Sequence, residues 1–258
     1  IKEEKPWVRF GISPFGIHRN LKDTPDGSGS ATNGLSNYEQ LYADVPLWAE
    51  KGYIDYIAPQ IYWKIGHPRA DYDVLINWWH DSHFKGHLYI GQNISTFNEP
   101  DLQDSTTTQM KRKMELVRTL PDVHGNIWWP GWSIPRNECA ILDSLSGTYQ
   151  RVHALIPEYS WIDDKAPEAV TSVTAAGGVL TWRTEATDDI FQQPHFYIVY
   201  RYARGERADL KDPAHIIAIT RSCYFRPDDG DMHEGDRYIV TVVDRCWNES
   251  PASAEASF

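Results

Sequence analysis

Polar and aromatic side chains follow directly after the apolar run 53–58, in the stretch that reads YIDYIAPQIYW. The amide of Gln60 offers both a hydrogen-bond donor and an acceptor. Tyr62 and Trp63 add flat apolar faces with a polar edge, on which a sugar ring can stack. If the apolar run is a strand that ends near Pro59, where a missing N–H costs little, these side chains form a sugar-binding surface.

Similar side chains follow the other apolar runs of the first 132 residues. The further candidate binding residues are Ser13, Arg19 and Asn20 after the first run, Gln92 and Asn93 after the third, and Trp129 and Trp132 at the last. In a parallel barrel the carboxyl ends of all strands meet at one face, which is where active sites lie. We therefore expect these residues to share a glycan-binding face.

Acidic residues are scarce among these strand-end positions. Hydrolysis of a glycosidic bond normally uses two carboxyl groups about 5–10 Å apart. Glu99, Asp101 and Glu138 lie just past strand ends, yet each is equally explained as an acid favoured by the dipole at a helix start. The catalytic residues stay unassigned, with Glu99 and Glu138 as candidates.

Other site chemistries fit the sequence less well. Pro14 follows Ser13 directly, which removes the backbone N–H that an oxyanion hole after a nucleophilic serine would use. His80 and His83 could share a helix face, but His87 begins the next strand, so we expect no metal site. The acidic run 226–236 lacks the ligand order of a calcium loop and predicts a solvated turn. No cofactor is expected.

The three cysteines, Cys139, Cys223 and Cys246, give no zinc spacing. One disulfide, for example between Cys223 and Cys246, and buried free thiols both remain open.

Strand-like and helical runs alternate through residues 1–162. The strands are expected in WVRFGIS, YIDYIAPQIYW, HLYIGQNI and GNIWWPGW, with helices in NYEQLYADVPLWAEKG, ADYDVLINWWHDSHFKG, 106–120 and 138–156. This alternation predicts about four βα units of a parallel sheet, whereas a complete (β/α)8 barrel needs about 250 residues. Because an open sheet leaves backbone edges unpaired, we expect the missing barrel half or a second copy of the chain as a partner.

Short alternating strands replace this pattern in residues 163–258 and predict an all-β sandwich of about seven strands. The segment resembles a fibronectin type III domain, with Trp182 at the core tryptophan, Tyr200 in the third strand and Tyr238 at the tyrosine corner. The resemblance implies a spacer or packing module. The predicted domains are therefore 1–162 and 163–258.

The charge balance excludes some classes of partner. The 258 residues carry a formal net charge of -11, which argues against nucleic acid and anionic membrane surfaces. No apolar run is long enough to span a membrane. The opening IKEEKPWVRF does not resemble a native N-terminus or a leader.

Several motifs in order, KPWVRFGISPFGIHRN, LYADVPLWAEKGYIDYIAPQIYW, YDVLINWW and LYIGQ, resemble the bacterial glycosyl hydrolase-like 10 family. The resemblance covers residues 6–132 and implies the second half of that family's (β/α)8 barrel. His18 departs from the family's usual tryptophan, and QNISTF and IWWPGWS also differ. An acidic segment like DDYFYP, from the first half of the family's barrel, is absent from this sequence.

The resemblance implies a glycoside hydrolase acting on a bacterial or environmental polysaccharide, with peptidoglycan glycan strands as one substrate. This chain would supply the substrate-binding half and would be inactive alone. It also implies export to the periplasm, cell surface or medium. Two alternatives stay open: a non-catalytic carbohydrate-binding protein, and an interaction or scaffold protein that uses the sandwich.

Overall fold

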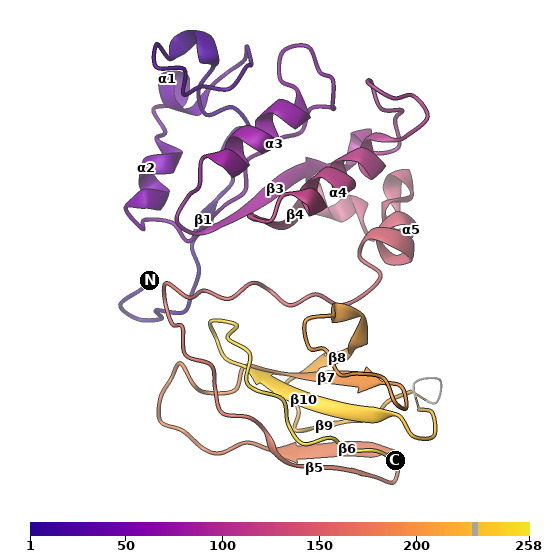
Figure 1. Ribbon diagram of the computed structural model, residues 1–258. Helices are drawn as coiled ribbons and strands as arrows, with labels where there is room; N and C mark the ends of the chain where they lie inside the picture. The colour runs from indigo at the N-terminus through magenta and orange to yellow at the C-terminus, as the bar shows by residue number, and fades with distance from the viewer. Residues whose placement is uncertain (229–231) are drawn as a thin grey trace. The chain divides into compact units, whose positions relative to one another are not determined.

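The computed structural model describes residues 1–228 and 232–258, which fold as two compact units (Figure 1). One unit comprises residues 9–149, and the other combines residues 1–8 with 150–258. The boundary expected after residue 162 stays a prediction. The acidic run 226–236, expected as a solvated turn, includes residues 229–231, which lie outside the described residues.

A four-stranded parallel sheet forms the centre of the unit 9–149. Its strands, in spatial order, are β1 (Gly11–Ile12), β2 (Tyr56–Ile57), β3 (His87–Asn93) and β4 (Val123–Trp129). The spatial order follows the order along the chain, as in successive βα units of a barrel. The predicted parallel α/β architecture is confirmed at this level, and the sheet is consistent with half a barrel.

The helices of this unit are short. They are α1 (Asn37–Leu41), α2 (Val45–Glu50), α3 (Tyr72–Asp81), α4 (Gln109–Thr119) and α5 (Ile141–Ser144), with 3-10 turns η1 (Leu21–Asp23), η2 (Ile94–Thr96), η3 (Gly131–Ser133) and η4 (Glu138–Ala140) and the π turn η5 (Leu145–Tyr149).

Two expected helices are broken where the backbone turns left-handed. Tyr42, at φ 55°, separates α1 from α2 where one helix was expected. The helix expected over 138–156 is a succession of short turns, and Cys139 and Ala140 have positive φ. A left-handed residue cannot continue a right-handed helix, so each break follows from one or two positions.

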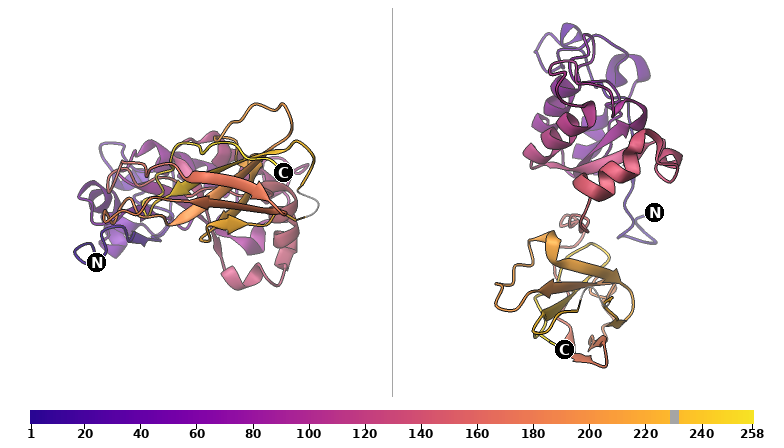
Figure 2. Two further views of the ribbon diagram at one scale, coloured as in Figure 1. Left: turned by 90° about the horizontal axis from the view of Figure 1, so that it is seen from below. Right: turned by 90° about the vertical axis from the view of Figure 1, so that its right-hand side faces the viewer.

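One face of the sheet is buried against the helices. Leu88 and Ile90 of β3 pack with Leu75 and Trp79 of α3 in the main core of this unit. Successive side chains of a strand point to opposite faces of the sheet, so Tyr89, between Leu88 and Ile90, points the other way. Figures 1 and 2 show α3 and α4 over this side of the sheet.

The opposite face of the sheet is more open and carries aromatic side chains. The rings of Tyr56 and Tyr89 meet edge to face at 5.7 Å between centroids. Ile127 of β4, on the same face, is 42% exposed. This is the face that would point into the interior of a closed barrel.

The second unit contains two antiparallel three-stranded sheets. The first sheet has the spatial order β5 (Thr171–Ala176), β6 (Val179–Arg183) and β9 (Tyr224–Phe225). The second has the spatial order β10 (Arg237–Val243), β7 (Phe196–Tyr202) and β8 (Ile216–Thr220). The 3-10 turn η6 (Pro213–His215) directly precedes β8 along the chain. Trp182 of β6 and Tyr238 of β10 are buried in one hydrophobic cluster between the sheets. The fibronectin type III assignment stays a prediction.

Cys139, Cys223 and Cys246 are all free thiols. Cys246 is buried as expected for a free thiol, whereas Cys139 and Cys223 are exposed. Among the described residues, the helices are too short or too polar to cross a membrane.

Candidate functional site

The carboxyl ends of β1, β2 and β3 converge through single backbone bridges beyond the regular strands. Gln60 pairs with Phe15 on one side and with Gly91 on the other, in parallel register. A Cβ atom on Gly91 would lie 2.9 Å from the carbonyl oxygen of Pro59, so only glycine fits this close approach. The three strand ends therefore form one continuous edge with Gln60 at its centre.

Gln60 and Ser13 join the first two strand ends through side chains. The amide Nε2 of Gln60 donates a 2.9 Å hydrogen bond to the carbonyl oxygen of Ser13. The hydroxyl of Ser13 donates a 2.8 Å bond to the carbonyl oxygen of Ala58. Within the described part of the chain, Oε1 of Gln60 accepts no hydrogen bond, which leaves an acceptor for a ligand hydroxyl.

Tyr62 and Trp63 are half-buried just beyond this edge. Trp63 packs against the helix-side core, and its ring centroid lies 6.4 Å from that of His67. Burial raises the pKa of the Tyr62 hydroxyl. Each ring keeps part of its surface accessible, which is enough for a ligand to contact an edge of it.

Gln92 lies on the other face of β3. Its side chain points to the same face of the strand as those of Leu88 and Ile90, and it is 0% exposed. Its Nε2 donates hydrogen bonds to the hydroxyl of Tyr72 at 2.7 Å and to Oδ1 of Asn126 at 2.8 Å. The structure thus separates Gln92 from the edge formed by Gln60. Its role is to connect β3 with α3 and β4 inside the helix-side core.

Asn93 and Trp129 pair in register at the ends of β3 and β4. Oδ1 of Asn93 accepts a 3.1 Å hydrogen bond from the backbone of Ser95 and so turns the chain after β3. Trp129 is 58% exposed and Trp132 is 55% exposed, and the guanidinium of Arg136 lies 4.8 Å from the ring centroid of Trp132. Such exposed indoles, at the end of a strand and on the turn that follows it, are suited to stacking on a sugar ring.

Arg19 and Asn20 organise the long connection between β1 and α1. Arg19 forms a 2.5 Å ion pair with Glu39, and its guanidinium lies 4.4 Å from the ring centroid of Tyr38. The bond to Arg19 holds the pKa of the Glu39 carboxyl below its usual value, although burial opposes this shift. The buried amide of Asn20 bonds both backbone groups of Gly34, at 3.0 Å each. Both side chains therefore shape the loop.

The candidate acids are engaged with neighbours. Glu99 forms an ion pair with Lys64. Glu138 accepts a 2.6 Å hydrogen bond from the hydroxyl of Ser133. Asp101 is buried and accepts hydrogen bonds of 2.8 Å from two backbone N–H groups that follow it, which makes it a loop cap.

Two of the three histidines considered for a metal site lie near one carboxylate. His80 Nε2 and His83 Nδ1 lie 3.8 Å and 3.9 Å from Oδ2 of Asp122. His87 is buried at the start of β3. In the described residues, no group of three or more histidine, cysteine or acidic side chains has a geometry that could hold a metal ion.

Lys113 is a feature of this region that the sequence reading missed. It is fully buried in α4, and its ammonium lies 4.4 Å from the ring centroid of Tyr72. Burial, together with the charge of Lys64, lowers its pKa to about 7. The signal was present, because Met110, Lys113, Met114 and Val117 share one helix face at the spacing of an apolar stripe.

Residues 1–109 match the model of the glycosyl hydrolase-like 10 family. This match confirms the resemblance predicted from the motifs. The chain is 37% identical over 264 aligned residues to the glycosyl hydrolase YngK of Bacillus subtilis, covering 98% of this chain and 50% of that protein.

A second relative aligns with about half of the chain. The glycosyl hydrolase DigH of Escherichia coli K12 is 38% identical over 135 residues, covering 49% of this chain and 30% of that protein. The chain therefore spans half or less of these curated relatives. Both relatives carry the name glycosyl hydrolase.

Among solved structures, a chain described as titin kinase and its flanking domains aligns with 36% of this chain and 16% of its own length. The TM-score is 0.28 and the identity is 17%.

Proposed function

We propose that the chain provides part of the glycan-binding face of a glycoside hydrolase, with polysaccharide as substrate. The observation that carries this proposal is the placement of exposed indoles at the carboxyl edge of the sheet, on Trp129 and Trp132, in a chain related to glycosyl hydrolases. Catalytic sites of parallel barrels lie at this edge.

Gln60 has the complementary polar role in this proposal. Its Nε2 is held by the carbonyl oxygen of Ser13, so the amide has a fixed orientation. Its free Oε1 then accepts a hydrogen bond from a sugar hydroxyl, while Tyr62 and Trp63 contact the ring. An immobilised amide loses little conformational entropy on binding, so even a single hydrogen bond from a sugar hydroxyl contributes to affinity.

The part of the relatives that lies outside the alignment, which we place upstream of this chain, is proposed to supply the remaining strands and the catalytic acids. Half of YngK lies outside the alignment with this chain. A barrel of eight strands requires about twice the number of strands in this sheet. We favour peptidoglycan glycan strands as the substrate. A protein exported from the cytoplasm would have access to them.

Binding can be tested directly on the 258-residue chain. We would titrate it with soluble peptidoglycan fragments and with cello- and xylo-oligosaccharides, and measure tryptophan fluorescence and heat. Trp129→Ala and Trp132→Ala should each weaken binding by about tenfold, because each removes a stacking platform. Tyr53→Ala is the matched control, since Tyr53 is a 68% exposed aromatic at the opposite, amino edge of the sheet. Equal loss in all three variants would contradict the proposed face.

A non-catalytic carbohydrate-binding protein is the second candidate. The observation that favours it is the engagement of Glu99 by Lys64 and of Glu138 by Ser133. Under this alternative, joining the upstream portion of a relative would strengthen glycan binding without producing any hydrolysis.

A further inference from the structure

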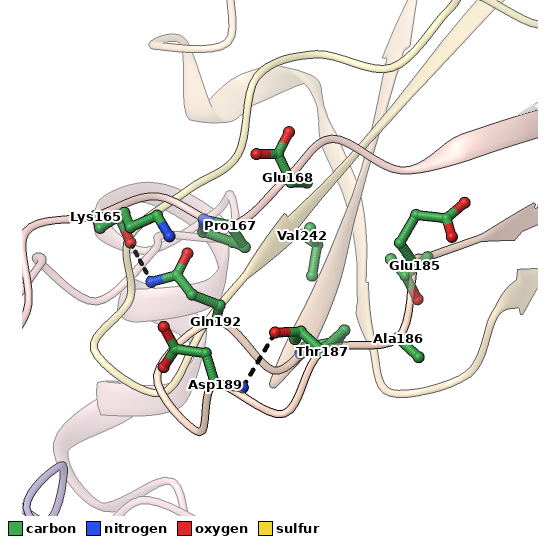
Figure 3. A pocket seen from close by; sticks show the side chains of 11 residues that line it. Lys165, Pro167, Glu168, Glu185, Ala186, Thr187, Asp189, Gln192 and Val242 are labelled. Carbon is green, nitrogen blue, oxygen red and sulfur yellow. Dashed lines mark hydrogen bonds between the residues drawn. The ribbon is translucent and has the colours of Figure 1, made fainter.

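A cavity of about 280 Å³ lies in the unit formed by residues 1–8 and 150–258. Its lining comes from the segment that precedes β5 and from the connection between β6 and β7, with Val242 of β10 also contributing (Figure 3). Cavities for small-molecule ligands usually measure about 300–1,000 Å³. This cavity is therefore suited to a single side chain.

The lining combines buried apolar groups with a negative rim. Pro167 and Val242 are buried and provide apolar contact surface. Glu168, Glu185 and Asp189 are exposed at the rim together with one cation, Lys165. Three carboxylates and one ammonium give the rim a net negative charge.

Two of these carboxylates have unused hydrogen-bonding capacity. Asp189 accepts a 3.1 Å hydrogen bond from the backbone of Phe191. In contrast, Glu168 and Glu185 form no ion pair and no hydrogen bond with any residue that the structure describes. Exposed carboxylates satisfied only by solvent can exchange that solvent for the donors of a cationic ligand.

Gln192 contributes an oriented amide to the lining of the cavity. Its side chain belongs to a residue only 9% exposed, and its Nε2 donates to the carbonyl oxygen of Lys165 at 2.9 Å and to Oδ2 of Asp163 at 3.3 Å. These two bonds fix which end of the amide faces the cavity. Figure 3 shows the oxygen directed away from the Lys165 carbonyl and toward Pro167. That oxygen accepts no hydrogen bond within residues 1–228 and 232–258, so it can accept one from a ligand.

We propose that this cavity binds the arginine side chain of a basic segment in a partner polypeptide. The apolar stem of arginine would lie against Pro167 and Val242, and its guanidinium would donate to Gln192 Oε1 and to a rim carboxylate. Arginine fits better than lysine because its planar fork carries five N–H donors and pairs with a carboxylate through two bonds. The formal net charge of -11 on the whole chain would speed the approach of a basic partner.

Blocked peptides test this proposal on the full chain. We would titrate the ¹⁵N-labelled protein with acetyl-Gly-Arg-Gly-amide, its lysine analogue and its citrulline analogue, which keeps the arginine shape but is neutral. Saturable shifts are expected at Thr184, Thr187 and the side-chain amide of Gln192. We expect affinity in the order arginine, lysine, citrulline, and a decrease as sodium chloride is raised from about 50 to 300 mM.

Variants of the rim provide the matched comparison. The double variant Glu168→Gln, Glu185→Gln should lower the affinity for the arginine peptide by about tenfold. It should also bind the arginine and citrulline peptides equally. Glu158→Gln changes an exposed acid of the same unit that does not line the cavity, so it should leave affinity unchanged. Equal binding of the citrulline peptide, or tighter binding of glucosamine at the same amides, would overturn the proposal. These measurements are independent of any glycosidase activity.

Discussion

The ammonium of Lys113 donates a 2.7 Å hydrogen bond to the carbonyl oxygen of Trp63 from a fully buried position in α4. This bond connects a helix of the outer layer to the turn that follows β2, directly beside the proposed glycan-binding edge. The same ammonium lies over the ring of Tyr72, whose hydroxyl contacts Gln92. A buried polar network thus supports the strand ends from behind.

The first prediction concerns the pH dependence of stability that Lys113 causes. Its pKa is lowered from 10.5 to about 7 by burial and by the charge of Lys64. Between these two pH values the unfolded chain binds more protons at this residue than the folded chain does, so stability rises with pH through that window. Below about pH 7 Lys113 is charged in both the folded and the unfolded chain, so the full cost of burying its charge lowers the free energy of unfolding.

Lys113→Met should remove this rise, because methionine fills the space without titrating. The measurement is the free energy of unfolding in urea at several pH values from about 6 to 10, compared between variants so that other titrations cancel. Lys111→Met is the control, since Lys111 lies on the same helix with an exposed side chain. An identical pH profile in wild type and Lys113→Met would contradict the prediction.

The second prediction concerns the close approach of β2 and β3 at their carboxyl ends. A Cβ on residue 91 would lie 2.9 Å from the oxygen of Pro59 and 3.2 Å from Cα of Gln60, both backbone atoms. Gly91→Ala should therefore cost about 1–3 kcal/mol of unfolding free energy and displace Gln60. Gly131→Ala, where an added Cβ meets nothing within 4 Å, should change stability by less than about 0.5 kcal/mol. A loss for Gly91→Ala as small as that expected for Gly131→Ala would show that the strand ends can separate at little cost in free energy.

The parallel sheet was predictable because its apolar runs are bounded by helical periodicity and turn residues. The expected helix over 106–120 corresponds to α4 at Gln109–Thr119, and the expected last strand corresponds to β4. The sequence did not predict that β2 contains only two residues, because the pairing beyond Ile57 consists of isolated bridges made by Gln60. Such contacts are long-range and leave no local periodicity.

The position of Gln60 at the carboxyl ends of the strands could be predicted from the sequence, but the directions of several candidate side chains could not. Gln92 follows Leu88 and Ile90 at intervals of two residues, so strand alternation alone would have placed it with the helix-side core. Arg19 and Asn20 lie in a loop with no such period, and their partners Glu39 and Gly34 are distant in sequence. The direction of a loop side chain depends on these partners, which the sequence does not reveal.

The third prediction tests the packing of the sandwich. Trp182 is buried between the two sheets, with its ring centroid 5.5 Å from that of Tyr197. Trp182→Ala should cost about 3–5 kcal/mol of unfolding free energy, as for other large core aromatics. Tyr224→Ala, at an exposed position of β9 in the same unit, should cost much less. A loss below about 1 kcal/mol for Trp182→Ala would mean that the core does not depend on this ring.

The last prediction is that the 258-residue chain binds glycans without cleaving them. Glycoside hydrolysis needs two carboxyl groups held about 5–10 Å apart across the scissile bond. Here Glu99 is paired with Lys64 and Glu138 is bonded to Ser133, while the strand edge itself presents an amide, hydroxyls and indoles.

An open four-stranded sheet also leaves edges that favour self-association. Reducing-sugar release from peptidoglycan and common polysaccharides should stay at background, and sedimentation should show species larger than a monomer. Glu99→Gln and Glu138→Gln should then leave glycan binding nearly unchanged, as should Glu115→Gln on the exposed surface of α4. Turnover by the wild-type chain that Glu99→Gln or Glu138→Gln abolishes, and that Glu115→Gln preserves, would place a catalytic acid in this chain. The upstream portion would then be needed only to shape the substrate cleft.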